Sequence, residues 1–247
     1  MYSPRGGSPF GGNNMFRSRY QYQTLPYGYE GVQASGLISK VMGLLAFSFI
    51  FASIGAFVGM QVVTGMGTYL FVVIAGFVVL IALNFLIQKS GINLFLLYLF
   101  TFLEGMGLGP LLNSYLQADS GYSNILAEAF LITAVTSLGL SVYAWTTKRD
   151  FSRLGDYLFF GLILLLVAGL IGFFFQSSLF ALIISVIGIA IFSGYVLFYV
   201  QRAKYMADTM PNAIGLTVSI FITVLNLFLY ILYLLTILQG GGGNRRR

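Results

Sequence analysis

Glu104 is the acidic residue that lies deepest within an apolar run of this sequence. It occupies the middle of a hydrophobic stretch over residues 92–117, where a charged carboxylate would cost roughly 2.5–3.5 kcal/mol at the centre of a bilayer. No Lys or Arg lies deep in any apolar run to neutralise it, so we expect the neutral acid to be common. Two interpretations stay open: a group in a functional pathway, and a protonated acid that hydrogen-bonds a neighbouring helix.

Three glycines and a proline follow Glu104 in the same run. Gly105 and Gly109 form a G-x-x-x-G pair, which permits close approach of a second helix. Pro110 lacks a backbone donor and frees a carbonyl near the acid. A kinked helix that carries a carboxylate suits the lining of a pathway, and tight helix packing explains the glycines equally well.

The remaining polar groups in the apolar runs offer little catalytic chemistry. Tyr199, Thr223 and Asn226 are groups of the kind that usually hydrogen-bond between helices. Glu128 lies near the start of its run, where we expect solvation at the interface. Leu154-Gly155-Asp156 is similar to part of the G-x-G-D motif of intramembrane aspartyl proteases. Arg153 stands where that motif needs glycine, however, and no aspartate lies within an apolar run to form a pair.

The composition narrows the class of protein further. Of 247 residues, 58% are hydrophobic and 8% are charged, against roughly 25% charged in a soluble domain. The chain has no cysteine and no histidine, which excludes disulfides, thiolate nucleophiles and the usual zinc sites. We therefore expect a membrane protein with no catalytic, cofactor-binding or metal site, and no nucleic-acid partner for its net charge of +6.

Seven apolar runs approach the ~20 residues that a membrane-spanning helix needs. They predict an all-α, polytopic membrane bundle of seven helices; six helices plus a re-entrant last segment is the alternative. We expect a disordered N-terminal tail over 1–35, a transmembrane domain over 36–239 and a basic C-terminal tail over 240–247. The predicted spans are 37–60, 69–88, 92–117, 124–146, 157–175, 179–200 and 212–238.

The basic residues predict an orientation. If the N-terminus is cytoplasmic, the short outer loops hold no Lys or Arg, as the positive-inside rule requires. The exception is the C-terminal triple arginine, which seven spans would leave outside, so the side of the C-terminus stays open. The inner segments hold Arg5, Arg17, Arg19, Lys40, Lys89, Lys148, Arg149, Arg153, Arg202 and Lys204.

Four stretches are similar to one known family. TTKRDFSRLGDYLFFGL (146–162) resembles the T-K-R-D-F-S-x-x-G-x-x-L-F loop between the fourth and fifth helices of the Bax inhibitor-1 family, also called transmembrane Bax-inhibitor-motif proteins. The G-x-x-x-G-P of residues 105–110 resembles that family's third helix. Ala129-Phe130…Thr133-Ala134 resembles the opening of its fourth helix, and Asn226-Leu-Phe-Leu-Tyr230 resembles its last helix. The resemblance covers about residues 37–238, and we expect a bacterial branch in the cytoplasmic membrane.

The resemblance implies calcium leak and protection from stress and cell death. The family's leak is attributed to one aspartate in the sixth helix and one in the seventh, latched by an arginine near the end of the second helix. Those positions fall on Tyr199, Thr223 and Leu86 in this chain, so the acid latch is missing. Tyr199 and Thr223 are candidates to hydrogen-bond each other instead.

Two functions therefore stay open. The first is a leak pathway for calcium or other cations, in which any acid-dependent step falls to Glu104. The second is a non-conducting scaffold or regulator that binds other membrane proteins in the lipid bilayer.

Overall fold

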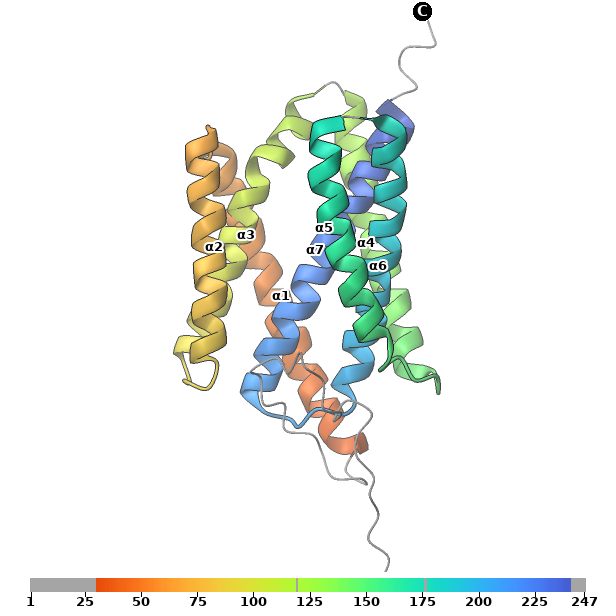
Figure 1. The fold of residues 1–247 in the computed structure, drawn as a ribbon. Coiled ribbons are helices and arrows are strands. Elements are labelled where there is room, and N and C mark those ends of the chain that lie inside the picture. The colour runs from red at the N-terminus through yellow and green to blue at the C-terminus, as the bar shows by residue number, and fades with distance from the viewer. Residues whose placement is uncertain (1–29, 119, 176, 241–247) are drawn as a thin grey trace, which may run out of the picture. The chain divides into compact units, whose positions relative to one another are not determined.

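The computed structural model describes residues 30–118, 120–175 and 177–240, and it contains seven α-helices and no strand within them (Figure 1). All seven are long and apolar enough to cross a membrane, which confirms the all-α, multi-pass prediction. The helices are α1 (Glu30–Val62), α2 (Met66–Leu86), α3 (Ile92–Gln117), α4 (Ser120–Thr146), α5 (Leu154–Phe175), α6 (Ser178–Ala203) and α7 (Met210–Gly240).

The helix boundaries extend beyond most of the predicted spans. Only α3 has the predicted limits. α1 begins at Glu30, so residues 30–35 are helical although we placed them in the N-terminal tail. The rest of that tail, residues 1–29, and residues 241–247 of the C-terminal tail lie outside the described residues. α7 is one helix of 31 residues, which favours a seventh span over a re-entrant segment.

The chain divides into two compact units. The described part of the first unit contains α1, α2, α3 and residues 202–221, which end α6, connect it to α7 and begin α7. The second unit contains α4, α5, most of α6 and the part of α7 from Ile222 onward. Each unit is described by itself below.

In the first unit, α3 packs against both α1 and α2. A sharp turn joins α2 to α3, and Gly91 supplies it with a φ of 80°, a conformation that residues with a Cβ rarely adopt. The beginning of α7 also enters this unit. The ring of Phe221 is fully buried and lies 5.3 Å from Phe49 of α1 and 6.3 Å from Phe100 of α3, between ring centroids.

In the second unit, a glycine of α6 lies against a large side chain of α7. A Cβ built on Gly188 of α6 would lie 2.6 Å from the ring of Tyr230 in α7. The rings of Phe130 in α4 and Phe228 in α7 stack with centroids 4.4 Å apart. Aromatic rings therefore hold α4 and α6 to the second part of α7.

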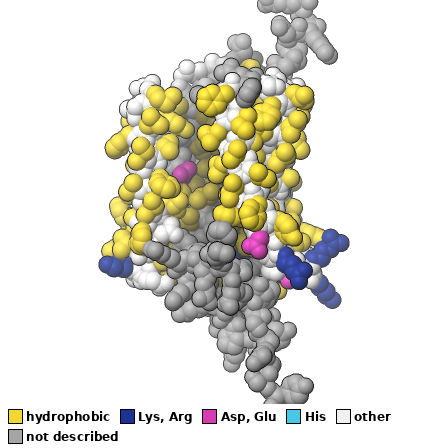
Figure 2. Space-filling model, viewed as in Figure 1, with side chains coloured by type: hydrophobic (Ala, Val, Ile, Leu, Met, Phe, Trp, Pro, Cys, Tyr) yellow, Lys and Arg dark blue, Asp and Glu magenta, His cyan; other side chains and the backbone are white. Residues whose placement is uncertain are grey.

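Hydrophobic side chains cover most of the visible face of each unit, and Lys and Arg lie toward the helix ends (Figure 2). Lys89 lies between α2 and α3, and three cations lie between α4 and α5. Helix α5 is the most exposed of the seven, with only 6% of its most apolar segment buried. Such surfaces are stable against lipid tails rather than water, so the protein contacts the lipid bilayer.

Candidate functional site

The side chain of Glu104 extends from the middle of α3 toward α2. A Cβ built on Gly76 of α2 would lie 3.6 Å from Oε1 of Glu104 and 3.8 Å from Cβ of Leu103. Gly76 is buried together with Val72 and Leu83 on the same helix, which defines the face that α2 turns toward α3. The missing side chain at position 76 thus leaves room for the half-buried carboxyl group between the two helices.

Among the described residues, the carboxyl group of Glu104 has no hydrogen-bonding or ion-pair partner. An acidic side chain at this depth usually forms a hydrogen bond or ion pair with a neighbouring helix, and the described residues form none with Glu104. Nor does the described part of the chain hold a cluster of three acids, cysteines or histidines that would bind a metal ion. A lone carboxyl group can exchange a proton and attract a cation, without holding the ion firmly.

Gly105 and Gly109 face α1 rather than a pathway. A Cβ on Gly105 would lie 2.0 Å from the carbonyl oxygen of Ala52, and a Cβ on Gly109 would lie 2.4 Å from the backbone of Gly59. The two helices touch backbone to backbone, so the packing interpretation of this G-x-x-x-G pair is the one that the structure supports. Pro110 lies within α3, which continues beyond it to Gln117.

α1 carries a matching pair of glycines that our sequence analysis missed. A Cβ on Gly55 would lie 2.0 Å from the carbonyl oxygen of Phe102, and one on Gly59 would lie 2.3 Å from that of Met106. The signal was present, because Gly55 and Gly59 are four residues apart and form a second G-x-x-x-G. The reciprocal glycine contacts fix α3 on α1 and so set the position of Glu104.

The other predicted residues belong to different places. Leu86 ends α2 in the first unit, whereas Tyr199, Thr223 and Asn226 lie in the second. The ring of Tyr199 stacks on Tyr195 with centroids 5.6 Å apart. Thr223 is buried in α7, and the hydrogen bond between it and Tyr199 stays a prediction. The amide of Asn226 donates within its own helix, 2.8 Å to the carbonyl oxygen of Ile222.

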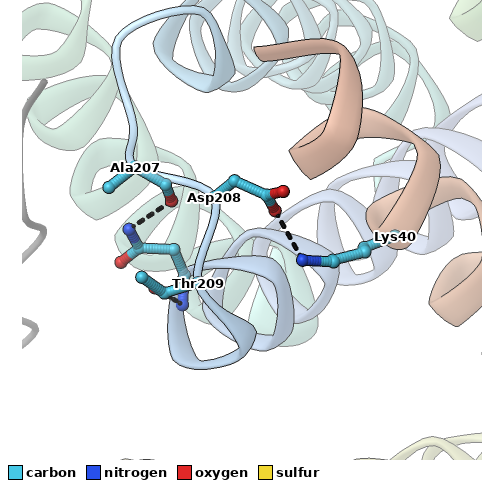
Figure 3. Close-up of polar contacts among 5 residues, drawn as sticks. Lys40, Ala207, Asp208 and Thr209 are labelled. Atoms are coloured by element: carbon cyan, nitrogen blue, oxygen red, sulfur yellow. Dashed lines mark hydrogen bonds and ion pairs between the residues drawn. The ribbon is translucent and has the colours of Figure 1, made fainter. Parts of the chain in front are cut away.

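An ion pair joins α1 to the segment between α6 and α7 within the first unit (Figure 3). Nζ of Lys40 lies 2.9 Å from Oδ1 of Asp208. A Cβ on Gly36, one turn before Lys40, would lie 2.5 Å from Oδ2 of Asp208, so the glycine makes room for the carboxylate. In the same segment, burial lowers the pKa of Lys204 below its ordinary value.

The same segment is tied to the start of α7. The side-chain amide of Asn212 donates to the carbonyl oxygen of Ala207 over 2.8 Å, and the hydroxyl of Thr209 accepts from the backbone N–H of Asn212 (Figure 3). Thr209 thereby caps the first turn of α7. These contacts keep Asp208 in place for its pairing with Lys40.

In the second unit, a buried glutamine holds the loop that follows α4. Gln201, near the end of α6, accepts from the backbone N–H of Phe151 and donates to the carbonyl oxygen of Arg149. Glu128 behaves differently from Glu104, because it is exposed and accepts a hydrogen bond of 2.7 Å from the side chain of Gln239.

These features define a multi-pass α-helical membrane protein with one deep, unpartnered carboxyl group in its described part. Residues 34–240 match the sequence model of a family described as inhibitor of apoptosis-promoting Bax1. The chain therefore belongs to the Bax inhibitor-1 family.

The curated relatives include bacterial proteins of similar length. A protein of Campylobacter jejuni is 36% identical over 217 residues, covering 84% of this chain and 92% of the relative. One from Pseudomonas aeruginosa is 34% identical, covering 89% of this chain and 97% of the relative. A third, named an uncharacterized membrane protein of Vibrio cholerae, is 37% identical over 64% of this chain and 72% of its own length.

Proposed function

We propose that the protein provides a leak pathway for cations across the membrane, with calcium as the cation that the family resemblance implies. The observation that carries the proposal is the carboxyl group of Glu104, half-buried between α2 and α3 without a partner among the described residues. An ionised carboxylate attracts cations and its protonated form does not, so Glu104 is the group that would make the leak depend on pH.

The proposal assigns this step to Glu104 because the family's acid latch has no counterpart here. Tyr199 and Thr223 stand where the resemblance places the two aspartates, and Leu86 stands where it places the arginine. The two aspartates and the arginine are all absent from this chain. The loss of only one partner would leave a buried charge without its counter-charge, so their joint absence is expected on electrostatic grounds. Tyr199 and Thr223 can hydrogen-bond, but neither side chain supplies the carboxylate charge of an aspartate.

We further propose that the protein resides in a bacterial cytoplasmic membrane with its N-terminus inside, and that it is not an enzyme. The support for the membrane is the bacterial origin of the three relatives named above. The support for the orientation is the distribution of Lys and Arg between alternate loops.

The test is calcium flux from vesicles that contain the purified protein, compared with empty vesicles. Wild-type protein is expected to leak, and Glu104→Gln is expected to alter the leak because it removes the charge and keeps the shape. Glu128→Gln is the matched control, since that carboxylate is exposed and already bonded to Gln239. Flux no greater than that of empty vesicles at every pH would overturn the leak proposal.

One observation favours a second candidate, a non-conducting scaffold or regulator that binds other membrane proteins. The positions of the family's latch hold Tyr199 and Thr223, so the groups with which the family conducts are absent. For this candidate, Tyr199→Asp combined with Thr223→Asp is expected to create a leak that the wild type lacks. A wild type that already leaks would exclude it.

A further inference from the structure

A shallow hollow at the start of α5 combines one cation, one anion and two aromatic rings. It has a volume of about 320 Å³ and is lined by Arg153, Asp156, Tyr157 and Phe160. These residues are spaced three, one and three apart, so they follow one face of the helix. All of them belong to the second unit.

The two charges in this hollow are available to a ligand. Neither Arg153 nor Asp156 forms an ion pair with a described residue. Both side chains are exposed, at the end of α5 where a span meets the membrane–water interface. Figure 2 shows basic and acidic side chains close together at this end of the unit.

Most of the apolar surface of α5 is exposed, and one line of it, called the stripe below, runs on from the hollow. Leu164, Val167 and Ile171 are 69%, 48% and 44% exposed. Together with Tyr157 and Phe160 they alternate in steps of three and four residues, the spacing of a single helix face. From 157 to 171 the stripe covers about 21 Å at the rise of an α-helix, more than the ~15 Å of one leaflet's hydrocarbon.

We propose that this hollow binds the headgroup of an aminophospholipid such as phosphatidylethanolamine, with an acyl chain lying along the stripe. Arg153 would bind the phosphate, because guanidinium and phosphate form charge-assisted hydrogen bonds. Asp156 would accept hydrogen bonds from the primary ammonium. Tyr157 and Phe160 would contact the glycerol and the beginning of the chain, as aromatic side chains do at membrane interfaces.

Charge complementarity favours a zwitterionic headgroup over an anionic one. The hollow holds one positive and one negative side chain, which match one phosphate and one ammonium. An anionic headgroup without an amine would pair its phosphate with Arg153 but would leave Asp156 with no cation to accept from. Lys148 and Arg149 precede the hollow in the chain and do not line it, so they attract any anionic surface without selecting a headgroup.

The experiment measures bound lipid on the full-length protein by native mass spectrometry. Phosphatidylethanolamine, phosphatidylcholine and phosphatidylglycerol with the same acyl chains are titrated against wild type, Arg153→Gln, Asp156→Asn and the control Lys148→Gln. Wild type is expected to bind phosphatidylethanolamine about tenfold more tightly than the other two, the scale of one hydrogen bond to a charged group. Phosphatidylcholine matters because its quaternary ammonium has no N–H to donate.

The variants separate the roles of the two charges. Arg153→Gln is expected to weaken phosphatidylethanolamine binding about tenfold. Asp156→Asn should remove the preference for phosphatidylethanolamine over phosphatidylglycerol. Lys148→Gln should change neither the affinity for phosphatidylethanolamine nor that preference. All three substitutions are at exposed positions, and unchanged unfolding temperatures would verify that they fold.

Three results would overturn the proposal. The first is wild-type binding that does not distinguish the three lipids or that favours phosphatidylglycerol. The second is a Lys148→Gln effect equal to those of Arg153→Gln and Asp156→Asn. The third is displacement of the lipid by soluble phosphoethanolamine at an equal concentration, which would assign the site to a free headgroup compound.

Discussion

The glycine contact between α1 and α3 predicts that one added methyl group will separate the helices. In Gly105→Ala the new Cβ would lie 2.0 Å from the carbonyl oxygen of Ala52. Ordinary van der Waals contact begins at 3.4 Å, so the backbones must move apart by the difference, about 1.4 Å. Neither backbone can yield as a flexible side chain would, because both belong to regular helices.

The free energy of unfolding should fall accordingly. Overpacking of a well-packed contact costs typically 1–3 kcal/mol, and we expect about 3 kcal/mol here because the obstacle is backbone. Glu104 precedes Gly105 directly, so the same separation should also displace the carboxyl group from Gly76. The prediction therefore includes an altered cation leak in Gly105→Ala vesicles.

Gly107→Ala is the matched control for this prediction. It lies on the same helix two residues away, and its added Cβ would have no neighbour within 4 Å. Alanine is the better helix former by about 1 kcal/mol, so the control should be as stable as wild type or slightly more stable. The assay is reversible unfolding in mixed micelles, followed by circular dichroism. Equal stability of Gly105→Ala and Gly107→Ala would show that the backbone contact between Gly105 and Ala52 does not limit the packing of α1 on α3.

Three further predictions concern the polar contacts. A double-mutant cycle with Lys40→Gln and Asp208→Asn should give a coupling free energy of about 0.5–1 kcal/mol that weakens with added salt, because the pair is partly exposed. Zero coupling at low salt would contradict the ion pair. Gln201→Leu should lower the free energy of unfolding by about 1–3 kcal/mol and speed amide exchange in the loop after α4. Gln117→Leu, at an exposed position, should do neither, and unchanged exchange in Gln201→Leu would argue against the hold of Gln201 on that loop. Burial lowers the pKa of Lys204, so the unfolded chain binds this proton more tightly and stability should rise with pH up to the ordinary pKa of 10.5. Lys204→Gln should flatten that rise, and an identical pH profile in the variant would show that Lys204 does not cause it.

The membrane architecture was predictable because each helix is encoded by its own stretch of sequence. Runs of about 20 apolar residues need no tertiary information to be recognised. The start of α1 at Glu30 was missed because residues 30–35 are polar and small. These residues are helical because they extend the membrane-spanning part of α1, although they are not hydrophobic themselves.

The contacts that position the candidate site were harder to predict. The depth of Glu104 in the membrane could be predicted from its place in the middle of an apolar stretch. The space beside it depends on Gly76 of α2, and the sequence does not show which residues of α2 face α3. Gln201 contacts a loop about 50 residues earlier in the chain, and Lys40 pairs with Asp208 across 168 residues. Such pairs depend on how the helices pack, whereas Gly55 and Gly59 carried a local signal that was overlooked.

The role of Glu104 is tested most directly by the pH dependence of calcium flux from vesicles, measured with wild type, Glu104→Gln and Glu128→Gln. We predict that wild type and Glu128→Gln leak more as the pH is raised, because an ionised carboxylate attracts cations. The Glu104→Gln variant should show no such rise. The same pH profile in all three proteins would show that Glu104 is not the titrating group of the pathway.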